Sequence, residues 1–131
     1  MIIKDVTSTS IRILIADDAK FIRDMLRGIL SKNDLASIIY ETENGEEALE
    51  AYKKFKPDLV FLDVHMPKVD GIEALYSILR FDLNAKIIMI SGIEQKSQMN
   101  QIVRQGAKDF VMKPFSESIV IEVVKKVLGL K

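Results

Sequence analysis

Leu59-Val60-Phe61-Leu62-Asp63 is a run of four apolar residues that stops at a carboxylate. A short apolar run with β-branched and aromatic members predicts a strand that is buried on both faces. Val64-His65-Met66-Pro67 and Asp70-Gly71 then predict a turn that leads into a new helical pattern. An acid at the carboxyl end of a central parallel strand faces the crevice in which open α/β sheets bind ligands. A lone Asp63 in this place is better explained as a turn residue or a helix cap, so its role depends on what lies beside it.

The composition is that of a soluble globular domain. The 131 residues are enough for one domain that buries roughly two-thirds of its unfolded surface. Lys+Arg and Asp+Glu both number 19, so the net charge gives no argument for a nucleic-acid or membrane partner. The absence of cysteine excludes a disulfide scaffold and a thiolate metal site. No apolar run approaches the roughly 20 residues that span a bilayer. We therefore expect a cytoplasmic protein. The chain is expected to consist of a lead-in at residues 1–10 and one domain at residues 11–131.

Five apolar runs alternate with five helical patterns along the chain. The expected strands cover residues 11–16, 36–42, 58–63, 85–90 and 107–112. The expected helices cover residues 19–32, 46–55, about 72–79 and 94–105, and a last helix has its apolar stripe at residues 119–128. This alternation predicts an α/β fold, with a doubly wound parallel sheet that helices cover on both sides.

The helix patterns also predict which residues are buried and which end each helix. In the first helix the apolar stripe consists of Phe21, Ile22, Met25, Leu26, Ile29 and Leu30. The polar residues expected on its opposite face are Lys20, Arg23, Asp24 and Arg27. An Asp before this helix is a natural N-cap, as is Ser116 before the last helix. Gly106 fits the C-terminal cap of the fourth helix.

Polar side chains follow four of the five expected strands, at the point where each strand ends. These residues are Asp17 and Asp18 after the first strand, Asp63 after the third, Ser91 after the fourth and Lys113 after the fifth. Each has an ordinary structural explanation when it is taken singly, as a cap, a turn residue or a solvated charge. Because parallel strands share one carboxyl edge, the five side chains are instead expected in one crevice.

The residue types in this group indicate the chemistry that it can perform. Three carboxylates repel one another unless a cation lies among them, and oxygen ligands without cysteine suit a hard ion such as Mg²⁺. A carboxylate is also a nucleophile toward phosphorus and forms an aspartyl phosphate. Transfer of a phosphoryl group requires its oxygens to be neutralised, here by the metal on one side and Lys113 on the other.

Five motifs occur in the order and spacing of one known family. They are Asp17-Asp18, Asp63-Val64-His65-Met66-Pro67, Asp70-Gly71, Ser91-Gly92 and Lys113-Pro114-Phe115. Together they resemble the receiver domain of two-component response regulators over nearly the whole chain. The resemblance implies a flavodoxin-like sheet of five parallel strands in the order 2-1-3-4-5, with five helices.

The resemblance also implies a phosphoacceptor and a metal site. Asp63 would accept a phosphoryl group from a phosphohistidine on a sensor histidine kinase. Asp18, Asp63 and the backbone carbonyl of His65 would bind Mg²⁺ directly, while Asp17 would act mainly through water. The protein would then be a signalling module and not a turnover enzyme, since it would catalyse only its own phosphorylation and dephosphorylation.

A switch is implied at the neighbouring strand ends. Ser91 and Lys113 would hold the phosphoryl group, and Phe110 stands where the family carries a rotating aromatic residue. The Lys113–Pro114 peptide bond would be cis. The partner-binding surface formed by the fourth helix, fifth strand and fifth helix would then change its affinity for a downstream protein.

Three residues are less typical of the family. His65 stands where a smaller or amide residue is common, and we expect its backbone, not its ring, to be the ligand. Gly92 replaces a common alanine beside Ser91, and Phe110 has no hydroxyl, so that it signals by packing alone.

Specific residues bear on the alternative functions. A relay intermediate, or a receiver from a longer regulator, has the same motifs. A haloacid-dehalogenase-type phosphatase needs a second aspartate where His65 stands. A flavodoxin-type FMN carrier needs a hydroxyl-rich and glycine-rich phosphate loop where Asp17-Asp18 would repel a phosphate.

Overall fold

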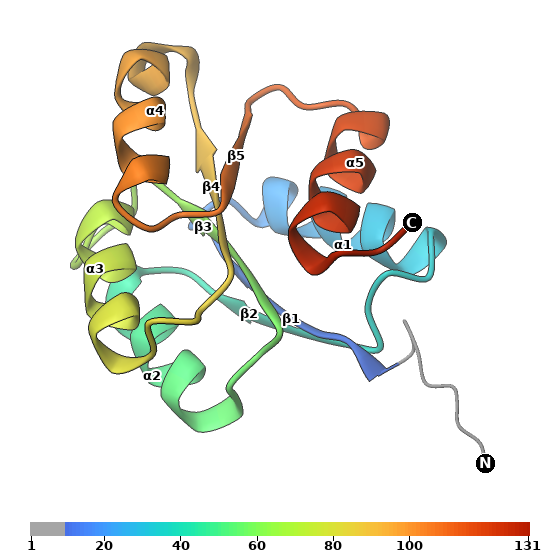
Figure 1. Ribbon diagram of the computed structural model, residues 1–131, viewed down its shortest axis with the longest axis horizontal. Helices are drawn as coiled ribbons and strands as arrows, with labels where there is room; N and C mark the ends of the chain where they lie inside the picture. The colour runs from blue at the N-terminus through green and yellow to red at the C-terminus, as the bar shows by residue number, and fades with distance from the viewer. Residues whose placement is uncertain (1–9) are drawn as a thin grey trace.

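The computed structural model describes residues 10–131 as a central sheet between two layers of helices (Figure 1). The predicted lead-in at residues 1–10 lies outside the described residues, apart from Ser10. The strands are β1 (Arg12–Ala16), β2 (Ile38–Thr42), β3 (Leu59–Asp63), β4 (Ile87–Ser91) and β5 (Asp109–Met112). All pairs are parallel and the order is β2-β1-β3-β4-β5, so the predicted topology is confirmed.

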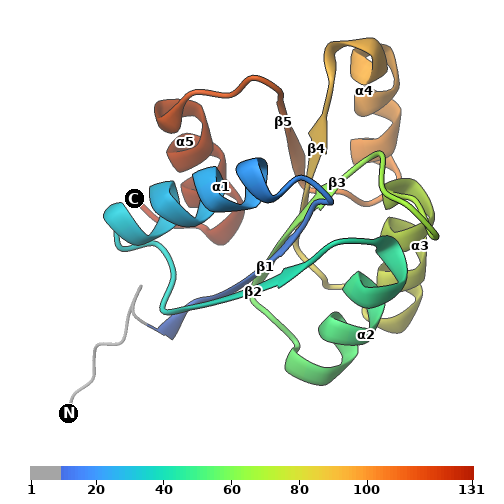
Figure 2. The same cartoon turned by 180° about the vertical axis from the view of Figure 1, so that it is seen from behind.

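Five α-helices connect and follow these strands in the described chain. They are α1 (Lys20–Lys32), α2 (Gly45–Phe55), α3 (Gly71–Phe81), α4 (Lys96–Arg104) and α5 (Glu117–Leu128). Helices α1 and α5 cover one face of the sheet, while α2, α3 and α4 cover the other (Figures 1 and 2). Among residues 10–131, no helix has the length and apolar character that crossing a membrane would need.

Strand β3 is buried along its whole length, as its apolar run predicts. Phe61 joins the core beneath α1 and α5, whereas Val60 and Leu62 join the core beneath α2, α3 and α4. Each apolar side chain of β3 therefore packs against helices, and full burial of such a side chain contributes roughly 1.5–3 kcal/mol. This central position places the carboxyl end of β3, and with it Asp63, in the middle of one edge of the sheet.

The helix caps explain most of the helix starts. The side chains of Asn44, Asp70 and Ser116 accept the backbone N–H of Glu47, Glu73 and Ile119, at 2.8, 2.9 and 3.2 Å respectively. The prediction that an aspartate caps the first helix is wrong, because the N-cap of α1 is Ala19. Asp17 Oδ1 accepts the N–H of Ala19 itself at 2.8 Å, so this side chain orders the turn before α1 and not its first helical turn.

Two residues of α1 differ from the prediction in how far they are buried. Phe21 is 69% exposed, although it belongs to the apolar stripe, and it lines a groove with Ile93 and Phe115. Arg23 is only 8% exposed, although it was expected on the polar face. Its guanidinium is buried because it pairs with Glu41 on β2, which the helical spacing alone does not show.

The fourth helix begins later than predicted. A 3₁₀ turn, Ile93–Gln95, precedes α4, and the side chain of Gln95 accepts the N–H of Gly92 at 2.6 Å. Gly106 follows the helix with a φ of +137°, a conformation that favours glycine. The peptide bond between Lys113 and Pro114 is cis, as the family resemblance implied.

Candidate functional site

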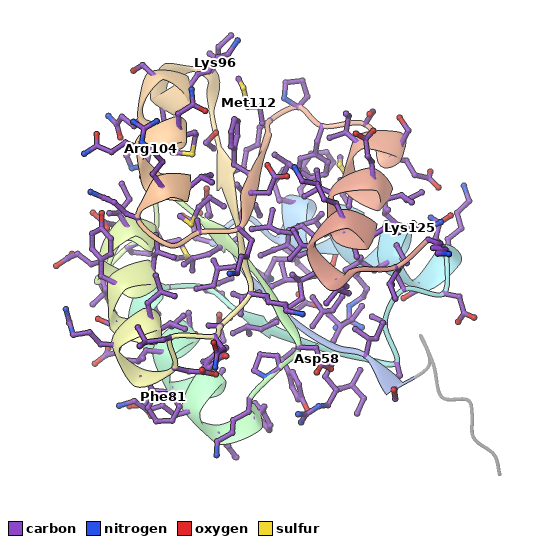
Figure 3. The ribbon with its side chains drawn as sticks, viewed as in Figure 1. Asp58, Phe81, Lys96, Arg104, Met112 and Lys125 are labelled. Carbon is purple, nitrogen blue, oxygen red and sulfur yellow. The ribbon has the colours of Figure 1, made fainter. Side chains whose placement is uncertain are left out.

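The carboxyl ends of the parallel strands lie together at one edge of the sheet. In Figure 3, Met112 at the end of β5 lies near the same end of the molecule as Lys96, and Asp58 and Phe81 lie toward the other end. The register pairs Ser91 with Met112, and the N–H of Lys113 donates to the Ser91 carbonyl at 2.8 Å. Backbone pairing therefore sets Ser91 and Lys113 side by side.

Three predicted acids meet in this crevice. Asp17, Asp18 and Asp63 each offer a carboxylate oxygen, and these oxygens all lie within 4.8 Å of one another. Asp17 is completely buried and Asp63 is 5% exposed, whereas Asp18 faces solvent. The Nζ of Lys113 lies 3.3 Å from Asp17 Oδ2 and 3.4 Å from Asp63 Oδ1. The structure thus brings together the acids and the lysine that the strand ends predicted.

The charges in the crevice shift one another's protonation. The pKa of Asp63 is raised to about 6, by burial first and by the charge of Asp17 second, while Lys113 works to lower it. Burial works to lower the pKa of Lys113, but Asp63 and Asp17 outweigh it, so that the pKa is raised. Lys113 is therefore a fixed cation, while Asp63 is a carboxylate whose ionisation is costly without a further positive charge.

The donors present fit a hard divalent cation. Three carboxylates face one ammonium, so two negative charges remain uncompensated within the cluster when all three acids are ionised. Among residues 10–131, the buried Asp17 Oδ2 accepts no hydrogen bond. Oxygen donors of this kind and charge are those that Mg²⁺ takes from proteins.

The other predicted site residues take different positions. Ser91 is fully buried, and its hydroxyl has no hydrogen-bond partner within the described chain. The side chain of His65 is exposed in the turn after β3, and its ring is not part of the cluster of acids. Phe110 is half-buried on β5, where it packs against the core that includes Met99 of α4.

Gly71 lets the loop after β3 close against the site. Its N–H donates to the Val64 carbonyl at 2.8 Å, and a Cβ at this position would lie 1.8 Å from the backbone oxygen of Asp63. A side chain here would push the loop away from the end of β3. This contact gives the Asp70-Gly71 motif a physical reason beyond the Asp70 cap.

The sequence did not predict the roles of two charged residues beside the site, Arg23 and Glu41. Arg23 Nη1 donates to the backbone carbonyl of Asp17 at 2.8 Å, and Arg23 Nε donates to Glu41 at 2.8 Å. The available signal was an arginine close to the apolar stripe of the first helix, six residues after Asp17. Its acidic partner, Glu41, lies on strand β2, and the periodicity of helix α1 contains no information about that strand.

Comparisons with known proteins give a consistent result. A family model described as the response regulator receiver domain matches residues 13–125. The chemotaxis protein CheY of Bacillus subtilis is 47% identical over 118 residues, which cover 90% of this chain and 98% of that protein. CheY of Thermotoga maritima is 45% identical over 116 residues, covering 88% and 96%. In the CheX–CheY–BeF3–Mg complex from Borrelia burgdorferi, the matched chain has a TM-score of 0.85 and 36% identity, covering 92% of this chain and 90% of that one.

Proposed function

The chain belongs to the response regulator receiver family, and from this premise we propose that it is a switch whose phosphoacceptor is Asp63. The observation that carries the proposal is the buried carboxylate of Asp63, which lies 3.4 Å from the Lys113 ammonium and meets the carboxylates of Asp17 and Asp18. No ordinary structural role requires three acids and a lysine to gather at the carboxyl end of a central strand.

The donor is a phosphohistidine on a sensor histidine kinase. A carboxylate oxygen of Asp63 attacks the phosphorus, a P–O bond forms, the P–N bond breaks, and its electron pair leaves with the imidazole of the donor. Lys113 lies close enough to Asp63 to neutralise a phosphoryl oxygen there. The buried hydroxyl of Ser91, which has no partner in the described chain, is available to donate to another. The protein would catalyse only its own phosphorylation and dephosphorylation, as a signalling module and not a turnover enzyme.

The acids also supply the metal site. Asp18 and Asp63, whose carboxylate oxygens lie near each other, would hold Mg²⁺ together with the backbone carbonyl of His65, and Asp17 would contribute mainly through water. When bound, Mg²⁺ neutralises charge on the oxygens of the transferring phosphoryl group. The side chain of His65 is exposed two residues after Asp63, and we expect it to affect the rate of hydrolysis.

The switch follows from the contact between β4 and β5. The phosphoryl group on Asp63 would carry about two negative charges at neutral pH and would draw the hydroxyl of Ser91 toward it. Phe110 pairs with Met89 in the register of these strands, so movement at the end of β4 changes the space that its ring occupies. The surface of α4, β5 and α5 then shifts between two packings with different affinity for a downstream protein. The Borrelia CheY was crystallised in a complex with CheX, BeF3 and Mg²⁺.

Beryllofluoride, a mimic of the phosphoryl group, is expected to bind only when Mg²⁺ and Asp63 are both present. Fluorine NMR of the wild type should show protein-bound fluoride signals in the presence of Mg²⁺, and none after chelation or in Asp63→Asn. Proton–nitrogen spectra of the same sample should show shifts at Ser91 and Phe110. Bound fluoride in Asp63→Asn would contradict the assignment of the phosphoacceptor.

A further inference from the structure

Arg23 is a buried cation whose position the proposed phosphorylation chemistry does not explain. It is 8% exposed, and its guanidinium forms hydrogen bonds to Glu41 and to the Asp17 carbonyl, both at 2.8 Å. A guanidinium stays charged at all ordinary pH values, so it is buried only where it is paired. Burial works to raise the pKa of Glu41, but hydrogen bonds from Arg23 and Arg27 outweigh it and lower the pKa. Glu41 is therefore the paired anion.

The hydrogen bond from Arg23 completes the fixation of Asp17. The Asp17 N–H donates to the Thr42 carbonyl at 3.1 Å, and Asp17 Oδ1 accepts the Ala19 N–H at 2.8 Å. Arg23 holds the carbonyl of the same residue. These contacts leave the buried Asp17 Oδ2 directed at Lys113, and they fix the peptide that leads into Asp18.

We propose that Arg23 is a positioning residue for the metal site. Through the carbonyl of Asp17, it holds the Asp17–Asp18 turn in the geometry that binds a divalent cation. Glu41 neutralises its charge and orients the fork of its guanidinium. This inference rests on the proposed function, because it takes the three carboxylates to be the Mg²⁺ site.

Geometry and charge predict opposite effects when Arg23 is replaced. A guanidinium next to the Asp17 carbonyl repels a divalent cation bound at the neighbouring carboxylates, so removing its charge alone would strengthen Mg²⁺ binding. Removing a residue that positions the ligands would weaken binding, and loss of such outer contacts typically costs 10–100-fold in metal affinity. The sign of the change therefore separates positioning from simple electrostatics.

Arg27 supplies a matched control. It lies one turn further along α1 and pairs with the same Glu41, at 2.6 Å. Its remaining hydrogen bond goes to the Ile39 carbonyl at 3.4 Å and not to Asp17. Arg27→Gln thus makes the same chemical change on the same anion without touching the acidic turn.

The test is calorimetric titration of the full chain with Mg²⁺ alone, without a phosphodonor, together with proton–nitrogen spectra of the metal-free proteins. Arg23→Gln is expected to weaken Mg²⁺ binding by about tenfold or more, and the amide signal of Asp18 should shift. Arg27→Gln should bind Mg²⁺ within about twofold of the wild type or slightly more tightly.

Arg23→Lys keeps the charge, and it serves as the second variant if Arg23→Gln does not fold. A single ammonium cannot reproduce the fork that reaches Glu41 and Asp17 together, so Mg²⁺ binding should still weaken several-fold. Unchanged or tighter binding in a folded Arg23 variant would overturn the positioning role. If the wild type itself did not bind Mg²⁺, the proposed metal site would be wrong, and the role of Arg23 would be lost with it.

Discussion

Asp63→Asn is expected to stabilise the metal-free protein at about pH 8, by as much as about 3 kcal/mol. Asp63 is 5% exposed, and its pKa is raised from 3.8 to about 6, by burial first and by Asp17 second. Because one pKa unit corresponds to about 1.36 kcal/mol, ionising Asp63 in the folded state costs about 3 kcal/mol relative to the unfolded chain. Asparagine has a similar shape and carries no charge.

The expected sign depends on pH. Because the pKa of Asp63 is higher in the folded protein than in the unfolded chain, the protonated form of Asp63 favours folding. This contribution to stability is complete below about pH 4 and is lost as the pH rises through about 6. Wild type and variant should therefore differ little at about pH 4 and most at about pH 8. Urea denaturation in EDTA at both pH values measures the difference, and added Mg²⁺ should reduce it.

Asp34→Asn is the matched control, since Asp34 is exposed and the substitution is chemically the same. It should change the free energy of unfolding by less than about 0.5 kcal/mol. An equal effect of Asp63→Asn at both pH values, or a loss of stability at about pH 8, would show that ionisation of Asp63 does not destabilise the folded protein.

Lys113→Ala is expected to slow phosphorylation by acetyl phosphate by about 10²-fold while Mg²⁺ binding is kept or strengthened. The Lys113 ammonium lies 3.3 Å from Asp17 Oδ2 and 3.4 Å from Asp63 Oδ1, so it would neutralise a phosphoryl group on Asp63 and would compete with the metal for the acids. Intact mass over time gives the rate, and calorimetry gives the metal affinity.

Lys108→Ala removes an exposed lysine before the opposite end of β5 and should change neither quantity. Loss of Mg²⁺ affinity in Lys113→Ala would mean that the lysine supports the metal site and not the phosphoryl group.

The sequence predicted those features that depend on one segment or on a shared edge of the sheet. The apolar run that ends at Asp63 predicted a strand buried on both faces, and β3 is buried along its length. Polar residues at strand ends predicted one crevice, because the fold itself brings those ends together. The strand order followed from the family resemblance, since alternation of strands and helices is compatible with several topologies.

The residues that were predicted wrongly depend on contacts between segments. Helical spacing assigned Arg23 to a solvent face, whereas its partner Glu41 lies 18 residues further along, on β2. The same spacing assigned Phe21 to the core, but that side chain is 69% exposed. Asp17 has the residue type of an N-cap, yet its carboxylate lies with the other acids, and Ala19 takes the cap position.

The most direct test of the central claim is to locate the phosphoryl group. The protein is incubated with acetyl phosphate and Mg²⁺, its intact mass is measured, and the acyl phosphate is then reduced with borohydride, which converts a phosphorylated aspartate to homoserine. We predict the gain of one phosphoryl group that requires Mg²⁺, homoserine at position 63, and no gain in Asp63→Asn. A phosphoryl group that Asp63→Asn still acquires, or homoserine at another aspartate, would contradict the assignment of Asp63 as the phosphoacceptor.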